Sequence, residues 1–257
     1  MKKNYFLLAA VFLIITVTGC KPSENKEILF QASTIGALME GDYEGNISFE
    51  ELARRGDFGI GTFEALDGEM AAFDDVFYQA KADGSVHTVG PSEKAPFAMV
   101  TFFKPDNSFL VNKAMKKDEI EEYLDGFLPT KNIFYAVRMD GIFSYIKARS
   151  VPRQNKPYPR LAEAVKNQVV FEFNDIKGTI VGFRCPEYVK GINVPGYHLH
   201  FISEDKSSGG HLLDYSIKIA NVQVSRITDF YMVLPESGKF FKSNQAGDRQ
   251  KELSVIE

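Results

Sequence analysis

The stretch of the sequence that most constrains the fold is residues 196–214, GYHLHFISEDKSSGGHLLD, which holds three of the four histidines of the chain. His198 and His200 stand two apart in an apolar run. This pattern predicts a strand with both imidazoles on one face, because side chains alternate along a strand. A polar turn with two glycines follows, and His211 begins the next apolar run. We therefore expect two antiparallel strands that carry the three histidines.

Three converging imidazoles form the ligand set of a catalytic zinc-type site, which leaves a fourth position open for water or substrate. The other interpretation is a set of strand histidines whose rings bond to backbone carbonyls. Simple hairpin pairing across Glu204–Gly210 would place His211 near Ser203 and away from His200. Convergence therefore needs a wider loop or an offset strand, and the spacing leaves both interpretations open.

Strand patterns outnumber helical patterns along the rest of the chain. Asp140-Gly141 and Asn174-Asp175 each lie between apolar runs and predict the turns of two hairpins. Ser48 has the Ser-x-x-Glu spacing that begins a helix, and Lys117–Leu128 has apolar residues at helical spacing. The other expected elements are a strand and a short helix over Ile28–Glu40, strands over Pro96–Phe103, Tyr197–Ser203, Leu212–Ala220 and Phe230–Leu234, and helices over Leu161–Lys166 and Asn244–Ile256. We therefore expect an α+β fold of mixed, mostly antiparallel β-sheets with a few helices, in two closely associated subdomains.

The N-terminus has the pattern of an export signal. Its apolar run, Tyr5–Val17, is too short to cross a bilayer comfortably and follows two lysines. The run ends in VTGC (17–20), which resembles a bacterial lipobox, in which the cysteine carries the lipid. We expect a lipoprotein-type signal peptide over 1–19, lipidation of Cys20, a tether over 20–27, an N-terminal subdomain over 28–150, and a C-terminal subdomain over 151–257 that carries the histidines. The protein would then be exported and anchored by lipid to the cell membrane; the alternative is an ordinary secretory signal with an incidental cysteine.

Charge and cysteine content exclude other classes. The net charge is −4, and no run of five or six basic residues occurs, so we expect no nucleic-acid partner. The two cysteines are Cys20 and Cys185. Once Cys20 carries lipid, no disulfide forms within the chain, and Cys185 is expected to be a small buried apolar residue.

Five stretches of the sequence resemble the α-acetolactate decarboxylase family, in the family's order. They are LFQASTIGALMEGDYEG (29–45), RGDFGIGTFEALDGEM (55–70), KNIFYAVRMDGIF (131–143), RSVPRQNKPYPRL (149–161) and GYHLHFISEDKSSGGHLLD (196–214). The resemblance implies that His198, His200 and His211 hold one zinc ion per chain, that Arg149, Glu69 and Glu257 are catalytic residues in the same cavity, and that Thr62 and Arg149 contact the substrate. It also implies the absence of an organic cofactor, and a homodimer.

The implied reaction converts (S)-2-acetolactate, a small molecule, to (R)-acetoin and CO2 in acetoin and 2,3-butanediol formation. Loss of CO2 leaves an electron pair beside a ketone, and a metal ion on the ketone and hydroxyl oxygens stabilises that charge as a Lewis acid. Arg149 suits the leaving carboxylate, and Glu69 or Glu257 would deliver a proton to one face. The alternatives are another exported zinc hydratase or hydrolase and a non-catalytic zinc-binding lipoprotein.

Overall fold

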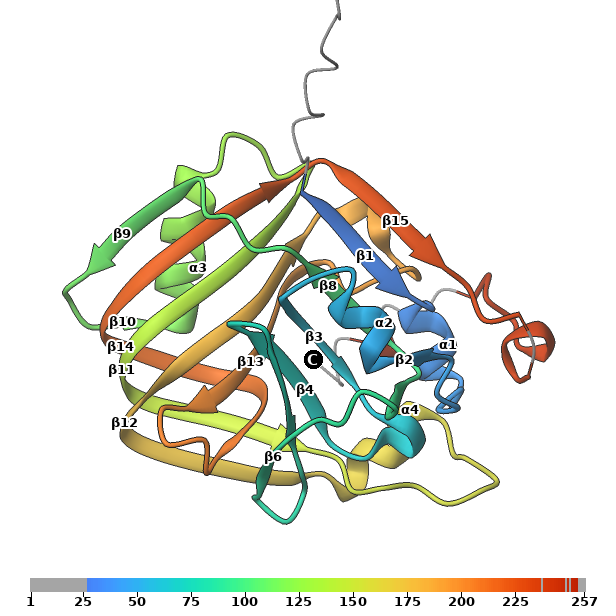
Figure 1. Cartoon of the computed structure of the whole chain (residues 1–257). Coiled ribbons are helices and arrows are strands. Elements are labelled where there is room, and N and C mark those ends of the chain that lie inside the picture. Colours follow the sequence, from blue (N-terminus) through green and yellow to red (C-terminus); the bar gives the residue numbers. More distant parts are fainter. Residues whose placement is uncertain (1–26, 237, 248, 250, 254–257) are drawn as a thin grey trace, which may run out of the picture.

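The computed structural model describes residues 27–253 apart from 237, 248 and 250 (Figure 1). Within these residues, the first sheet has the strand order β15 (Asp229–Val233), β1 (Ile28–Ala32), β8 (Ala98–Thr101), β3 (Phe58–Thr62), β4 (Glu69–Phe73), β5 (Val76–Ala80) and β6 (Val86–Thr88). Neighbouring strands are antiparallel except β1 and β15, which are parallel. A small separate pair joins β2 (Ile47–Ser48) and β7 (Lys94–Ala95).

The second sheet is built from long strands that close on themselves. Its order is β10 (Met115–Lys116), β14 (Gly209–Ile227), β11 (Phe134–Ser150), β12 (Val169–Cys185) and β13 (Gly196–Ser203), with β9 (Asn107–Val111) also paired to β14. β13 pairs with β12 along its length and with the start of β14. The long strands β14, β11 and β12 and the shorter β13 therefore form a closed ring, which lies beside the first sheet in Figure 1.

The helices are short and sit between strands. They are α1 (Ile35–Met39), α2 (Phe49–Ala53), α3 (Lys117–Phe127) and α4 (Leu161–Ala164). Ser48 begins α2 as predicted, because its hydroxyl oxygen accepts a hydrogen bond from the Glu51 N–H. Among the described helices, none is long and apolar enough to span a membrane. The mostly antiparallel strands and few helices confirm the expected α+β fold.

The two hairpins predicted at Asp140-Gly141 and Asn174-Asp175 are wrong. Both dipeptides lie inside continuous strands, β11 and β12, which pair with each other over nearly their whole length. A β-carbon at Gly141 would overlap the carbonyl oxygen of Ile219, so this glycine serves the close approach of β11 and β14. Asp175 has a positive φ of 50°, which marks a local irregularity within β12 and not a reversal of the chain.

The helix predicted over Asn244–Ile256 is wrong for most of its described part. Residues 244–247 form a loop and turn, and helical conformation occurs only at residues 251–253; positions 254–256 lie outside the described residues. The Asn244 side chain accepts a hydrogen bond from the Ala246 N–H. Such a local bond gives the backbone an alternative to the helix. The other expected strands and helices are present at about their predicted positions.

The central strands of the first sheet are buried on both faces. On one face Ile60 belongs to a core that also contains Val181 and Phe183 of the ring, and Cys185 lies in that core, 1% exposed, as expected. On the other face the sheet packs against α2 through Phe49. Every residue of β4 is therefore buried, and its first residue faces the ring.

The predicted division into subdomains 28–150 and 151–257 stays a prediction. β9, β10 and β11 precede residue 151 and belong to the second sheet, whereas β15 follows it and belongs to the first. Each of the two sheets therefore contains strands from both sides of that boundary.

Candidate active site

The three histidines come together where the ring closes. His198 and His200 lie on β13, and His200 pairs directly with His211 on β14. Simple hairpin pairing, which would place His211 near Ser203, does not occur, and the two strands are offset instead. The turn is confined to residues 204–208, and both following glycines already belong to β14. This offset places His211 beside His200.

Gly210 lets β14 approach β11 closely at this point. Its φ is +150°, and a β-carbon there would collide with the backbone carbonyl of Arg149. The approach pairs Arg149 with His211 across the two strands. The strand that closes the ring thus also aligns the arginine with the histidines.

All three imidazoles are buried and close to one another. His198, His200 and His211 are 6%, 2% and 2% exposed. Their ring centroids are 5.0–5.3 Å apart, and one ligand nitrogen of each lies within 4.8 Å of the other two. In the described part of the chain, this is the only group of His, Cys, Asp or Glu side chains so spaced to hold an ion.

Burial keeps the imidazoles neutral. Loss of hydration, together with the charge of Arg149, lowers the pKa of His198 to about 3, and loss of hydration also holds the pKa values of His200 and His211 well below 6.5. Only a neutral imidazole offers a lone pair to a metal. Nδ1 of His200 lies 2.7 Å from the carbonyl oxygen of Met70, which can only accept. Nδ1 therefore carries the proton, and the lone pair of His200 is on Nε2.

The nitrogen spacing fits a tetrahedral ion. Nδ1 of His211 and Nε2 of His200 are 3.4 Å apart. Two nitrogens that each lie about 2.0–2.1 Å from one ion, at the tetrahedral angle, would be about 3.3–3.4 Å apart. This pair of nitrogens therefore has the spacing of two ligands of one divalent ion. His198 offers a third nitrogen within 4.8 Å of one nitrogen of each of the other two histidines, and one position is left for a further ligand.

A buried ion pair lies beside the histidines. Nη1 of Arg149, near the end of β11, is 2.5 Å from Oε1 of Glu69, the first residue of β4, and their side chains are 6% and 9% exposed. Oε2 of Glu69 is 3.8 Å from Nε2 of His200. Thr62 pairs with Glu69 across β3 and β4 and donates its hydroxyl hydrogen to the carbonyl oxygen of Gly68. Because water is excluded, the charges of the pair are little screened.

These side chains line one cavity of about 30 Å³. Its polar wall contains Thr62, Glu69, Arg149, His198, His200 and His211, and its apolar wall contains Ile35, Leu38, Leu66, Phe97 and Leu161. We call Ile35 and Leu38 of α1 and Leu161 of α4 the roof of the cavity. The arrangement offers three nitrogen ligands to a metal ion and, in Arg149, a buried cation to an anionic ligand.

The predicted site residues that the structure describes all line this cavity, whereas Cys20 and Glu257 lie outside the described residues. The sequence patterns predicted neither the apolar residues of the roof nor the Met70 carbonyl oxygen as parts of the site. Ile35 and Leu38 lie within the family-like stretch 29–45, but an apolar pattern does not distinguish a cavity-lining residue from one in the core. A backbone acceptor carries no sequence signal at all.

The sequence profile of the family described as Alpha-acetolactate decarboxylase matches residues 29–246. The chain is 50% identical over 231 residues to the alpha-acetolactate decarboxylase of Methanosarcina mazei, covering 90% of this chain and 80% of that protein. It is 42% identical over 216 residues to that of Bacillus subtilis (strain 168), covering 84% and 85%. The crystal structure of alpha-acetolactate decarboxylase from Bacillus subtilis strain 168 has a TM-score of 0.88 at 40% identity, over 90% of this chain and 99% of that one. The chain therefore belongs to the α-acetolactate decarboxylase family and is a carboxy-lyase.

Proposed function

We propose that the chain converts (S)-2-acetolactate to (R)-acetoin and CO2, in acetoin and 2,3-butanediol formation, with one zinc ion held by His198, His200 and His211. The observation that carries the proposal is the convergence of three neutral imidazoles and the buried Arg149–Glu69 pair on one small cavity. When bound, the ion supplies Lewis-acid stabilisation of the charge that develops on the ketone and hydroxyl oxygens.

Arg149 binds and orients the substrate carboxylate. Its guanidinium is a planar, permanently charged fork, and its burial strengthens a contact with a carboxylate. The hydrogen bond that Nη1 donates to Glu69 restrains the position of the guanidinium. Arg149 therefore holds the carboxylate that leaves as CO2 next to the three histidines.

A carboxyl group delivers the proton that completes the product. Glu69 lies between Arg149 and Nε2 of His200, next to the place where the enediolate carbon must be protonated. Decarboxylation of the anion consumes one proton, so Glu69, or Glu257 if it reaches the cavity, first takes up a proton from water. It then gives this proton to one face of the enediolate and so sets the configuration of acetoin. The apolar roof keeps bulk water away from that carbon.

The test incubates the 257-residue chain with racemic acetolactate and follows acetoin before chelation, after chelation, and after zinc is returned. We expect acetoin to form faster than the spontaneous background, to stop on chelation, and to resume with zinc. A chain that holds one zinc ion and yet accelerates nothing would contradict the proposal and favour another zinc enzyme or a zinc-binding lipoprotein.

We also propose that the protein is exported and that Cys20 carries the lipid once residues 1–19 are removed; the lipobox-like sequence supports this. When cells are fractionated, wild-type protein should be found in the membrane fraction, and the Cys20→Ser variant should be absent from it. A variant that stays with the membrane would contradict the anchor. The homodimer that the family resemblance implies is tested by the molar mass in light scattering.

A further inference from the structure

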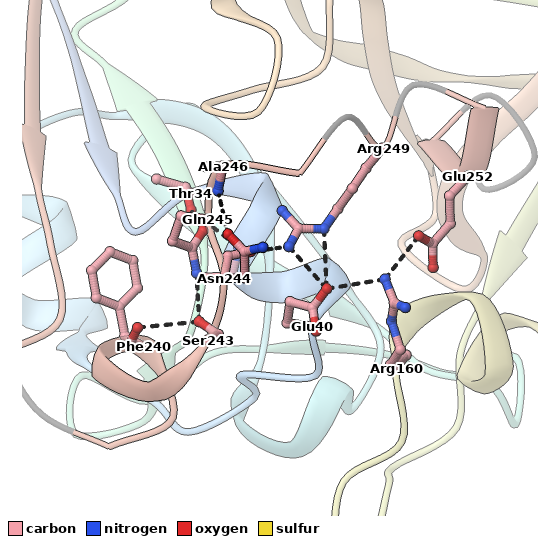
Figure 2. A network of polar contacts seen from close by, with 11 residues as sticks. Thr34, Glu40, Arg160, Phe240, Ser243, Asn244, Gln245, Ala246, Arg249 and Glu252 are labelled. Atoms are coloured by element: carbon pink, nitrogen blue, oxygen red, sulfur yellow. Dashed lines mark hydrogen bonds and ion pairs between the residues drawn. The ribbon is translucent and has the colours of Figure 1, made fainter.

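The C-terminal segment, residues 239–253 without the undescribed 248 and 250, contacts the rest of the fold at several places, and one of them is the carboxylate of Glu40. Oε1 of Glu40 lies 3.0 Å from Nε and 2.9 Å from Nη2 of Arg249, and 3.0 Å from Nη2 of Arg160 (Figure 2). The same Nη2 of Arg160 is 2.9 Å from Oε2 of Glu252. We call Glu40, Arg160, Arg249 and Glu252 the Glu40 ion cluster.

The cluster joins the two helices that carry the roof of the cavity. Glu40 is the C-cap of α1, which supplies Ile35 and Leu38, and Arg160 is the N-cap of α4, which supplies Leu161. A carboxylate at a helix C-terminus is electrostatically unfavourable, and α1 has no basic residue in its last turn. Arg160 and Arg249 therefore supply the cations that α1 lacks.

The segment also fits closely against α1. Thr34, the N-cap of α1, donates a hydrogen bond of 3.2 Å to Oε1 of Gln245. A β-carbon at Gly36 would lie 3.0 Å from Oε1 of Gln245 and 3.3 Å from Nη1 of Arg249. The bare face of α1 at Gly36 is thus where the segment docks.

Both polar contacts and one buried apolar side chain hold this segment. Leu253 is buried in the same core as Leu38 and Leu161, but Phe241 is 69% exposed. The Arg249 and Glu40 side chains are 11% and 22% exposed, so water screens their attraction less than that of Arg160, which is 49% exposed. The Arg249–Glu40 pair is therefore the least screened ion pair between the segment and the rest of the fold.

We propose that the Glu40 ion cluster is a clamp that holds the C-terminal segment on the roof of the cavity, and that Glu40 and Arg249 are positioning residues for the decarboxylation. The second half of the proposal rests on the proposed function. By joining α1, α4 and the segment, the clamp keeps the apolar roof in place over the reacting carbon.

The first test measures hydrogen exchange, by mass spectrometry, in the zinc-loaded 257-residue chain. The substitution Glu40→Gln keeps the shape of the side chain at the centre of the Glu40 ion cluster and removes its charge. Exchange of the amides in residues 239–253 should accelerate by about tenfold or more, because the segment loses charge-assisted bonds. The matched control is Glu163→Gln, which removes one negative charge from α4. Among the described ion pairs, Glu163 pairs only with the exposed Lys166. Equal protection of the segment in Glu40→Gln and wild type would overturn the clamp.

The second test measures acetoin production and bound zinc. Glu40→Gln and Arg249→Met should keep one zinc ion per chain and a KM within about twofold of wild type, because Arg149 and the histidines are unchanged. The kcat should fall by about tenfold or more, because the roof is no longer held in place over the reacting carbon. The double variant should be no slower than the slower single variant, because the two residues act through one contact. Arg249→Lys, which keeps the charge, should recover most of the loss.

Single variants with wild-type kcat would refute the positioning role, and so would losses that simply multiply in the double variant. If the wild-type chain makes no acetoin, the proposed function fails. The exchange measurement, which needs no substrate, still decides whether the clamp exists.

Discussion

The buried pair of Arg149 and Glu69 yields a prediction whose size can be worked from the structure. In Glu69→Gln the side chain keeps its shape and loses its charge. The pair is 2.5 Å apart between Nη1 and Oε1, and its side chains are 6% and 9% exposed. The two charges are spread over the whole guanidinium and carboxylate groups, so their centres are taken as ~4 Å apart. At an effective dielectric constant of ~20 such charges attract by ~4 kcal/mol. Since the variant no longer has to dehydrate a carboxylate, part of this loss is offset, and the free energy of unfolding should fall by about 2–4 kcal/mol.

The stability assay is urea unfolding of the metal-free protein, because a bound metal would itself stabilise the folded state. Zinc is then restored and acetoin is followed. The three histidines are unchanged in Glu69→Gln, and His200 keeps its bond to the Met70 carbonyl. The variant should therefore bind one zinc ion and lose turnover by about 10²-fold or more.

The control is the double variant Glu69→Gln/Arg149→Met. It removes the pair only once, so its loss of stability should be smaller than the sum of the two single losses. A Glu69→Gln protein with wild-type stability and wild-type turnover would refute both the energetic account of the pair and the role of Glu69.

Three further predictions concern the ligands, the pH dependence and the long strands. His198→Ala should lose both zinc and acetoin production, which metal analysis and the enzyme assay check; a metallated, active variant would defeat the ligand assignment. Burial raises the pKa of Glu121 to about 7, above its ordinary 4.5. The folded state then holds this proton more tightly than the unfolded state, so the contribution of Glu121 to stability falls as pH rises from about 4.5 to 7 and is level above. Glu121→Gln, which copies the protonated form, should be more stable than wild type at pH 8 and similar at pH 4.5 in thermal unfolding; a difference that does not change with pH would contradict this. Gly141→Ala forces a β-carbon against the β14 backbone, so the free energy of unfolding in urea should fall by about 1–3 kcal/mol or more. An unchanged unfolding midpoint would contradict the close approach of β11 and β14 at this glycine.

The period-two pattern of His198 and His200 predicted their common face, because alternation is a property of the strand itself. The register that brings His211 to His200 was not predictable in the same way. It depends on where the turn ends, and the glycines at its end belong to β14. Local spacing cannot distinguish a glycine in a turn from a glycine in a strand whose neighbour approaches closely.

The same ambiguity explains the error at Asp140-Gly141. The dipeptide is a turn signal when the strands on either side can pair with each other. Here β11 already has β12 and β14 as neighbours, and Gly141 is needed where β14 passes close. Tertiary pairing thus overrides a local preference. Arg149 and Glu69, 80 residues apart, were suggested only by the resemblance to the family, because no pattern along the chain links them.

The bond between His200 and residue 70 has a consequence for how this protein tolerates change. The acceptor is the main-chain oxygen of Met70, and every amino acid has that atom. Substitution of Met70 by another residue of similar size leaves the proton on Nδ1 and the ligand lone pair on Nε2. The orientation of this imidazole is therefore insensitive to those changes at Met70 that keep the backbone of β4 in place.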